Sequence, residues 1–385
     1  MTLITTSEDL QTFCGRLKGA EFITVDTEFM RERTFWPKLC LVQVADMNEA
    51  AAIDPLADGI DLQPLFDLLD ARETVKVFHA ARQDLEIFHY LMGHLPVPVF
   101  DTQVAGMVCG FGDQVGYETL VARLTRARLD KGSRFTDWSL RPLSARQIDY
   151  ALSDVTHLRQ VYAKLKKRVD ASGRSGWLDE EMAILCDTAT YEPDPMEIYR
   201  RIKSRNGKGR FLAVLRELAA WRELEARERD VPRNRILRDE ALLEIAHHLP
   251  SSAEDLARTR GLGRKLAEGS SGSQILQAVA RGLAIPDDEC PEPDAKRDVP
   301  RGVAPVADLL KVLLKMKCDK EDVAQKLVAS SADVDIIAAD GEDADVRALH
   351  GWRRQVFGED ALRLRNGELS LAINGRKVVL VDRAE

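Results

Sequence analysis

Short apolar runs alternate with helical patterns over roughly the first 170 residues. The runs typical of strands span residues 22–26, 39–45, 50–54 and 74–78. The first three follow one another through short connections, which predicts antiparallel pairing. The fourth follows a helical pattern over 61–69, which predicts a crossover and parallel pairing. We therefore expect a mixed sheet with helices packed against it.

The clearest helix in the pattern begins after Ser144. Ser144 and Gln147 have the spacing of a capping box, in which each side chain binds the other residue's backbone N–H. Apolar residues then recur at helical spacing at 148, 152, 155, 158, 162 and 165. Shorter helices are predicted over 80–91 and around 117–124. Together these elements indicate an α/β domain over residues 1–170.

The rest of the chain is predicted to be mainly helical. Residues 171–207 form a connecting segment with Gly, Ser and Pro breaks, and residues 208–285 show only helical periodicity. Residues 286–300 form an acidic, Pro-rich linker, and residues 301–385 a second helical segment. Near the end, Asn374 and Gly375 could turn the chain into a short strand, and the pattern does not decide between strand and helix.

Composition removes several classes of protein. With 385 residues and 45% hydrophobic residues, the chain is neither disordered nor a small disulfide scaffold. Its net charge is −8, so any affinity for nucleic acid must come from local positive charge. The six cysteines show no zinc-ligand spacing, and no segment has a signal-peptide or membrane-helix pattern. We expect a cytoplasmic protein with reduced thiols and no membrane partner.

Acidic residues follow two of the predicted strands. Asp26 and Glu28 alternate along one strand, so both side chains point to the same face, where a divalent cation would relieve their repulsion. Taken alone, such a pair is more simply explained by a solvated strand end. Asp84 lies in the first turn of a helix after a buried strand. An acid at this position could also do no more than interact favourably with the positive end of the helix dipole. Asp101 has the position of a helix cap.

A further acid is predicted on the long helix. Tyr150 and Asp154 are four residues apart, so they lie one turn apart on one helix face, beside the apolar stripe. A Tyr next to an Asp on a helix is common in structural settings. The combination is more specific, because four carboxylates come from three elements and a phenol accompanies the last.

These segments resemble a family of nucleases. The three carboxylate segments are similar to the Exo I, II and III motifs of the DEDD superfamily of 3′-to-5′ exonucleases, and the Tyr four residues before the last Asp marks its DEDDy subgroup. Residues 26–43, 79–84, 129–143 and 150–154 resemble the ribonuclease D family within it. The resemblance covers roughly residues 1–285, and all four carboxylates and the Tyr are present.

The resemblance implies a ribonuclease H-like fold and metal-dependent hydrolysis at RNA 3′ ends, releasing nucleoside 5′-monophosphates. Two divalent ions, Mg²⁺ or Mn²⁺, are expected about 4 Å apart. By analogy Asp26 bridges both ions, Glu28 and Asp154 complete one site, and Asp84 holds the other. Tyr150 orients the attacking water. Trimming of tRNA precursors is the family expectation. The predicted partner is such a precursor or other structured RNA with a free 3′ end, and we expect a monomer, although the sequence does not determine the oligomeric state.

Residues 220–243 resemble the helicase-and-RNase-D C-terminal domain, abbreviated HRDC, a small helical module that binds nucleic acid. Residues 301–385 are similar to a second, degenerate copy. Between Arg200 and Arg238 there are 13 Lys or Arg against 5 Asp or Glu. That excess suits phosphate contacts, although alternating Arg and Glu over 222–229 also fit a solvated helix with ion pairs.

Specific side chains are candidates for RNA contacts. Basic residues near the carboxylates would bind the phosphate backbone of the RNA. Phe29 and Trp138 would stack on RNA bases. Phe29 could equally belong to the hydrophobic core. Arg33 and Arg141 are further basic candidates close to the site. The predicted RNA contacts are Phe29, Arg31, Lys131, Arg134, Trp138, Arg200, Arg201, Lys203, Arg205, Lys208 and Arg210.

Two other functions remain open from the sequence. One is a DNA exonuclease of the same chemistry, because the metal ligands do not contact the 2′-hydroxyl. The other is a nucleic-acid-binding scaffold with a vestigial exonuclease domain, against which the full carboxylate set argues. The natural RNA, the choice between Mg²⁺ and Mn²⁺, and RNA binding by residues 301–385 are not determined by the sequence.

Overall fold

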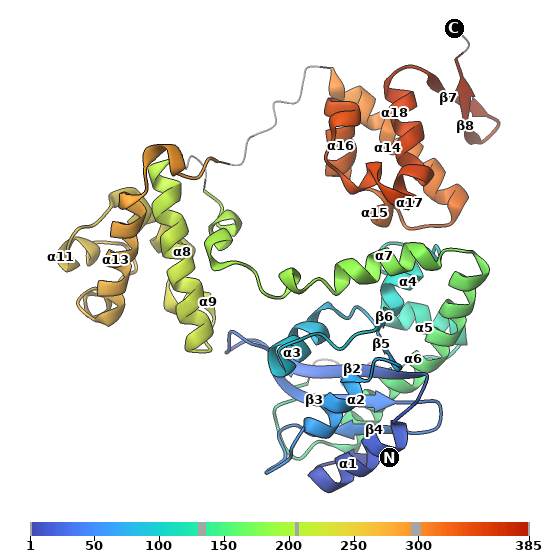
Figure 1. Cartoon of the computed structure of the whole chain (residues 1–385), viewed down its shortest axis with the longest axis horizontal. Helices are drawn as coiled ribbons and strands as arrows, with labels where there is room; N and C mark the ends of the chain where they lie inside the picture. The colour runs from blue at the N-terminus through green and yellow to red at the C-terminus, as the bar shows by residue number, and fades with distance from the viewer. Residues whose placement is uncertain (1, 130–135, 205–207, 294–301, 384–385) are drawn as a thin grey trace.

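The computed structural model describes residues 2–129, 136–204, 208–293 and 302–383, so Lys131, Arg134 and Arg205 lie outside the described residues. Within the described part, six strands form one sheet in the order β1-β4-β3-β2-β5-β6 (Figure 1). The strands are β1 (Thr2–Ile4), β2 (Phe22–Met30), β3 (Lys38–Ala45), β4 (Ala50–Ile53), β5 (Val75–Phe78) and β6 (Val99–Asp101).

The predicted pairing of the sheet is confirmed. β2 pairs antiparallel with β3, and β3 pairs antiparallel with β4. β5 pairs parallel with β2, as the intervening helix predicted. The short β1 and β6 extend the sheet in parallel at its two edges. The mixed α/β class is therefore as expected. Because β2 and β5 pair in parallel, their C-terminal ends lie on the same side of the sheet.

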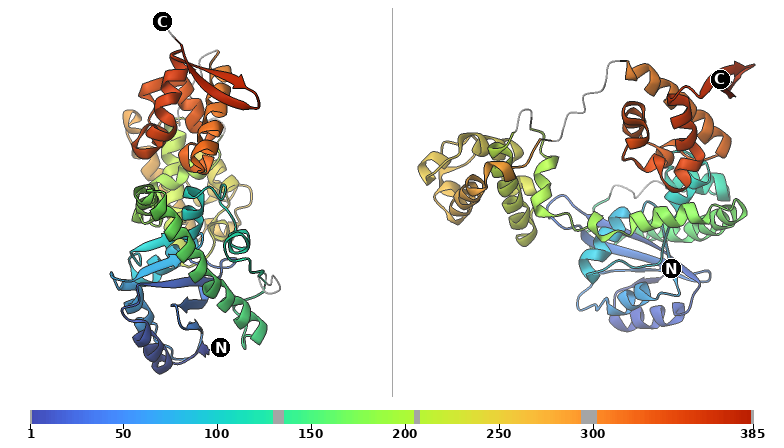
Figure 2. Two further views of the ribbon diagram at one scale, coloured as in Figure 1. Left: turned by 90° about the vertical axis from the view of Figure 1, so that its right-hand side faces the viewer. Right: turned by 45° about the horizontal axis from the view of Figure 1, so that its top comes forward.

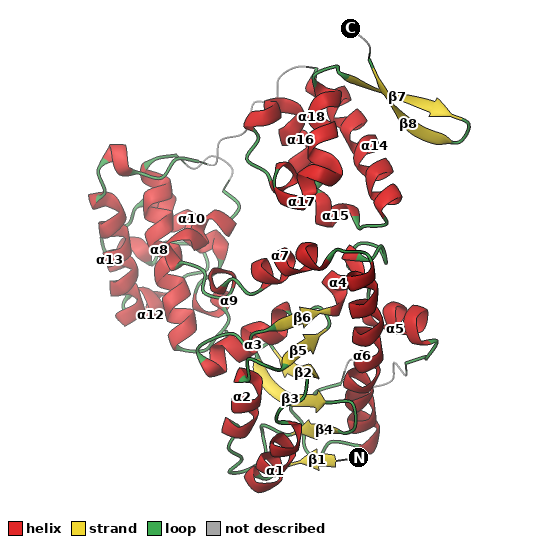
Figure 3. Cartoon of the chain, turned by 45° about the vertical axis from the view of Figure 1, so that its right-hand side comes forward, coloured by secondary structure: helices red, strands yellow, loops and turns green. Residues whose placement is uncertain are grey.

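Helices cover both faces of this sheet (Figure 3). The long helix α6 crosses one face, and its Ala151 and Leu152 pack on Cys40 and Leu41 of β3. The Ser144–Gln147 capping box is present at its start. Helices α1, α2 and α3 pack on the other face. The helices of this domain are α1 (Ser7–Leu17), α2 (Gln63–Asp70), α3 (Arg82–Met92), α4 (Thr102–Val108), α5 (Tyr117–Thr125) and α6 (Ala145–Ala171).

A helical domain with its own core follows. It is reached through α7 (Ser175–Leu185) and the short 3₁₀ segment η2 (Pro195–Arg201). Its core gathers apolar side chains of α8, α10 and α13, including Leu215, Leu242 and Ile275. Its helices are α8 (Arg210–Glu228), α9 (Arg233–Ile236), α10 (Asp239–His248), α11 (Ala253–Leu256), α12 (Arg264–Ala267) and α13 (Ser270–Ala284).

The C-terminal segment packs against the α/β domain and shares a core with it. Buried residues of α14, α16 and α18 belong to the same apolar cluster as residues of α4, α5 and α6. The Trp177 and Trp352 rings stack across this contact, with centroids 4.3 Å apart. The helices are α14 (Val303–Glu321), α15 (Gln325–Val328), α16 (Ser331–Asp340), α17 (Gly351–Arg353) and α18 (Glu359–Arg365).

The structure decides the chain end that the sequence left open. β7 (Leu369–Asn374) and β8 (Lys377–Asp382) form an antiparallel hairpin that turns at Gly375, whose φ is +62°. Figure 2 shows this hairpin projecting from the C-terminal helices. Among the described residues, no helix combines the length and the apolar character needed to cross a bilayer.

Candidate active site

Three of the four predicted carboxylates converge on one face of the internal strand β2. One carboxylate oxygen each from Asp26, Glu28 and Asp154 lies within 4.8 Å of the others. Asp26 and Glu28 share a face of β2, and the β2–β3 register shifts directly after Glu28. Asp154 comes from α6, which crosses that face of the sheet. An all-oxygen set at this separation suits a hard divalent cation.

Asp84 lies buried beside this group and is held by two elements. Its Oδ1 accepts a hydrogen bond from the Thr27 hydroxyl on β2, and its side chain is 7% exposed. The helix that carries it is positioned by Asp101, which accepts from the backbone N–H groups of Ala80 at 3.0 Å and Ala81 at 2.8 Å. Asp101 also caps α4, so the cap predicted from sequence is confirmed.

Burial and mutual repulsion disfavour the charged carboxylates when no cation is present. Burial, followed by repulsion from Asp26, Asp154 and Asp84, raises the pKa of Glu28 to about 9. Burial raises the pKa of Asp26 to about 7. The pKa of Asp84 is well above its usual range, because of burial and of Asp26. Carboxylates crowded in this way are stabilised by a positive charge placed among them.

The cleft around the carboxylates has a volume of about 840 Å³. Phe29 and Tyr150 line it together with Trp138, whose side chain is only 3% exposed. The Trp138 ring lies 6.2 Å from the Tyr150 ring and packs in the core below. Phe29 also packs against the core of the opposite sheet face. Both predicted stacking residues thus reach the cleft, and their contact with RNA stays a prediction.

Two cleft residues were missed by sequence reasoning. The Tyr117 hydroxyl donates a hydrogen bond to the backbone carbonyl of Asp154, and burial keeps the pKa of this phenol well above its usual range. His79 lines the cleft, and its Nδ1 lies 3.0 Å from the Thr102 hydroxyl. Burial lowers the pKa of His79, so the imidazole is neutral. The only sequence signal for Tyr117 was its place at a helix start.

Arg141, expected near the substrate backbone, belongs to the fold. All five of its N–H groups donate to protein atoms: the Asp54 carboxylate and the backbone carbonyls of Cys40, Trp138 and Leu140. The interpretation of Arg141 as an RNA contact is therefore wrong. A guanidinium directly after the Trp138 segment was easily mistaken for a substrate ligand, because its partners are distant in sequence.

The other basic candidates differ in their surroundings. Arg31 forms an ion pair with Glu86 on α3, and Arg200 with Glu197. The Arg210 guanidinium donates to Asp287 and to carbonyls at the end of α13, including that of Leu283 at 2.9 Å. Arg33, Arg201, Lys203 and Lys208 are exposed. None of these observations tests RNA binding, so these contacts stay predictions.

Comparison with known families gives two matches. Residues 1–170 match the 3′-5′ exonuclease family. Residues 211–279 match the HRDC domain. The first range contains every cleft carboxylate, and the second contains α10, nearly all of α8 and the first two thirds of α13.

Similar proteins span nearly the whole chain. Ribonuclease D of Gluconacetobacter diazotrophicus is 54% identical over 376 residues, covering 98% of this chain and 95% of that protein. Ribonuclease D of Granulibacter bethesdensis is 51% identical over 381 residues, covering 99% and 96%. The crystal structure of Escherichia coli RNase D, an exoribonuclease involved in structured RNA processing, superposes with a TM-score of 0.80 at 30% identity, covering 95% and 98%.

Proposed function

The chain belongs to the ribonuclease D family of 3′-to-5′ exoribonucleases, and from this premise we propose that its cleft removes nucleotides from RNA 3′ ends as nucleoside 5′-monophosphates. The observation that carries the proposal is the convergence of Asp26, Glu28 and Asp154 within 4.8 Å. Asp84 adds a fourth carboxylate directly beside them. No vestigial scaffold needs to keep four repelling carboxylates in one place.

The donor set fits divalent cations, and the family is metal-dependent. We propose two ions, Mg²⁺ or Mn²⁺, held by Asp26, Glu28, Asp154 and Asp84. When bound, the ions would lower the pKa of the attacking water and stabilise negative charge on the leaving 3′ oxygen. All the ligand atoms in this cluster are carboxylate oxygens, which supports this assignment.

We propose that one tyrosine of the cleft orients the attacking water and that another holds a metal ligand in place. Tyr150 lines the cleft beside Asp154 and would orient the attacking water through its hydroxyl. Tyr117 holds the backbone of Asp154 and is therefore a positioning residue. The neutral His79 packs behind Tyr117, with ring centroids 5.3 Å apart. These side chains keep the carboxylates and the water in a fixed arrangement.

Replacing Tyr150 with Phe is expected to lower kcat about tenfold to a hundredfold, because a water-positioning hydroxyl is lost while every metal ligand remains. The Mg²⁺ concentration that gives half-maximal rate should change less than threefold. A titration of initial rate against Mg²⁺ measures both quantities. A strong shift in that titration with unchanged kcat at saturating metal would contradict the assigned role.

The metal-free protein is expected to lose stability as pH rises. Glu28 and Asp26 have pKa values of about 9 and about 7, against 4.5 and 3.8 for the free groups, so the folded state retains protons that the unfolded chain has released. The free energy of unfolding therefore falls between about pH 4 and pH 9. A divalent cation binds the deprotonated carboxylates, so Mg²⁺ should raise Tm more at pH 8.5 than at pH 6.

Thermal unfolding in EDTA and in Mg²⁺ at the two pH values measures this effect. Glu28→Gln removes the group with the larger shift and should flatten the dependence of Tm on pH in EDTA. An equal Mg²⁺ effect at both pH values in the unmodified protein would exclude the carboxylates as proton-linked ligands.

The substrate and the setting are further parts of the proposal. We propose tRNA precursors or other structured RNA with a free 3′ end as substrates, a monomeric protein and a cytoplasmic location. The six cysteines are all free, which supports a reducing compartment. We also propose functional units at residues 1–170, 208–285 and 301–385, joined by segments 171–207 and 286–300. The separate core of α8–α13 supports the second unit.

One experiment tests the activity directly. RNA and DNA of equal sequence, labelled at the 3′ end, are incubated with the protein in Mn²⁺ and in EDTA. We expect metal-dependent release of labelled mononucleotide from RNA. Equal rates of release from DNA would favour an exonuclease that also degrades DNA. Binding of either nucleic acid without release of mononucleotide would favour a nucleic-acid-binding scaffold.

A further inference from the structure

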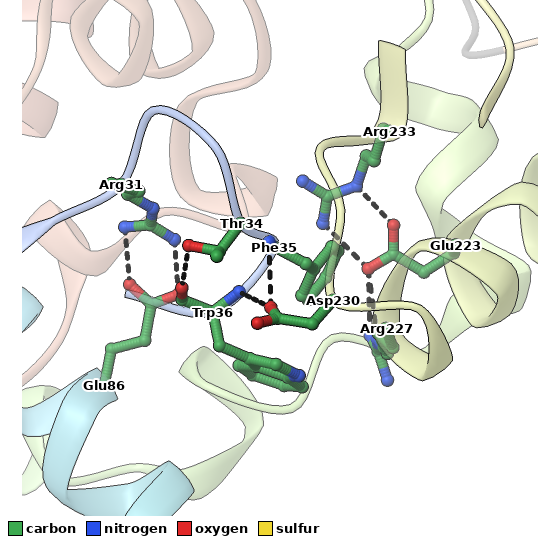
Figure 4. A network of polar contacts seen from close by, with 9 residues as sticks. All are labelled: Arg31, Thr34, Phe35, Trp36, Glu86, Glu223, Arg227, Asp230 and Arg233. Carbon is green, nitrogen blue, oxygen red and sulfur yellow. Dashed lines mark hydrogen bonds and ion pairs between the residues drawn. The ribbon is translucent and has the colours of Figure 1, made fainter. Parts of the chain in front are cut away.

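The loop between β2 and β3 of the exonuclease domain contacts the helical domain. The backbone N–H groups of Phe35 and Trp36 both donate to Asp230 Oδ1, each at 3.0 Å (Figure 4). The Arg233 guanidinium lies over the Phe35 ring, 4.6 Å from its centroid. This loop continues β2, the strand that carries two cleft carboxylates. The helical domain therefore contacts the α/β domain close to the end of the strand that carries these carboxylates.

Two adjoining cavities of about 320 and 470 Å³ lie at this junction and share Arg31, Phe35, Arg201 and Arg233. We call them together the arginine groove. Three acidic residues also line it, so its net charge is +3 in a chain of net charge −8. The arginines that line the groove are Arg31, Arg82, Arg201, Arg222, Arg227 and Arg233.

Four of these arginines are paired within the protein. Arg227 and Arg233 both bind Glu223, whose side chain is fully buried. Arg222 pairs with Asp239, at 2.6 Å. Arg31 forms two hydrogen bonds with Glu86, at 2.8 and 2.6 Å. These pairs fix the walls of the groove.

Arg82 and Arg201 differ from the other four. Neither forms a hydrogen bond or an ion pair with any residue that the structure describes, and both are exposed. Arg82 comes from the first turn of α3 in the α/β domain, and Arg201 from the end of η2 in the connecting segment, so the two reach the groove from different parts of the chain. Two unpaired guanidinium groups beside a positive wall can bind phosphate oxygens through paired N–H donors.

The arginine groove is continuous with the catalytic cleft. Gln83, the residue between Arg82 and Asp84, lines both. On β2, Phe29 and Met30 line the cleft, and the following Arg31 lines the groove. A strand whose 3′ end lies at the carboxylates can thus leave the cleft over Gln83 and enter the groove.

We propose that the arginine groove binds backbone phosphates of the RNA on the 5′ side of the nucleotide being removed, with Arg82 and Arg201 as the direct ligands. This inference rests on the exoribonuclease activity proposed above. The groove adds binding energy that depends on strand length and not on base identity, because it contacts the backbone. It also gives the attached helical domain a defined part in holding the substrate.

The test compares RNA of increasing length, from two to twelve nucleotides, with the Arg82→Ala/Arg201→Ala double variant. We expect kcat/KM on the dinucleotide to stay within twofold of the unmodified protein. On the longest RNA kcat/KM should fall about tenfold. The slope of log K against log salt for that RNA should become flatter by about 1.4, because two single-strand phosphate contacts contribute about 0.7 each.

Arg72→Ala/Arg260→Ala is the matched control, since it removes one exposed arginine from each domain away from the groove. It should leave both the long-RNA rate and the slope unchanged. Equal losses on the dinucleotide and the long RNA, or an unchanged slope in the groove variant, would overturn the proposal. The Arg201→Ala single variant, far in sequence from Asp84, should show the same length dependence at smaller size. Absence of mononucleotide release by the unmodified protein would instead reject the activity, and the salt slope would still test the groove.

Discussion

Asp26→Asn is expected to lower the turnover of 3′-labelled RNA at least about a thousandfold, because it removes a charged ligand from the proposed two-ion site. Asp26 lies within 4.8 Å of Glu28 and Asp154, and its charge also raises the pKa of Asp84. The substitution relieves that repulsion, so the expected loss of turnover comes from the missing charged ligand itself and not from the ionisation of the remaining carboxylates. Initial rates at saturating Mg²⁺, with protein purified away from host nucleases, measure the loss. Asp84→Asn should behave in the same way.

The same variant separates catalysis from folding. Removing one of several repelling carboxylates should leave the metal-free Tm unchanged or raise it. Asp58→Asn is the matched control, because Asp58 is exposed in the loop before α2 and does not line the cleft. It should retain full turnover. Turnover of Asp26→Asn within tenfold of the unmodified protein would remove Asp26 from the mechanism, and a large fall in Tm would show a structural role instead.

Arg353→Ala is expected to lower the free energy of unfolding by about 3 kcal/mol, because it leaves a buried acid without its partner. Arg353 is 5% exposed, pairs with Glu181 on α7 and donates to the Leu327 carbonyl at 2.8 Å. Next to it, Trp352 stacks on Trp177. Urea unfolding measures the loss when it is followed by the fluorescence of the five tryptophans, of which Trp177 and Trp352 lie at this contact.

The neighbouring Arg354 provides the control. Its side chain is 38% exposed and pairs with Glu342 and Glu359, so Arg354→Ala should cost less than about 1 kcal/mol. Equal shifts of the urea midpoint for the two variants would mean that the C-terminal helices do not stabilise the exonuclease domain. Because the C-terminal helices share a core with the exonuclease domain, a chain that ends inside the linker near Asp288 would expose an apolar face of α4, α6 and α7 to solvent.

Much of the local structure was determined by the sequence itself. Strand periodicity predicted β2, β3, β4 and β5 with their pairing directions, and the Ser144–Gln147 spacing predicted the start of α6. Asp101 acts as the predicted cap. Residues spaced by two on a strand or by four on a helix share a face whatever surrounds them, because backbone geometry sets that relation. The same geometry paired Asp26 with Glu28 and Tyr150 with Asp154.

Tertiary structure alone decided which of these faces meet. Asp154 joins Asp26 and Glu28 because α6 crosses the sheet at β2, and Tyr117 reaches the Asp154 carbonyl from α5. The sequence offered Arg141 as a substrate ligand, yet Asp54 binds it from 87 positions away. Pairing of a guanidinium depends on which acids and carbonyls packing brings within reach. Periodicity and spacing describe one element at a time, so the joint core of the C-terminal helices and the arginine groove between domains became visible only when those elements were packed together.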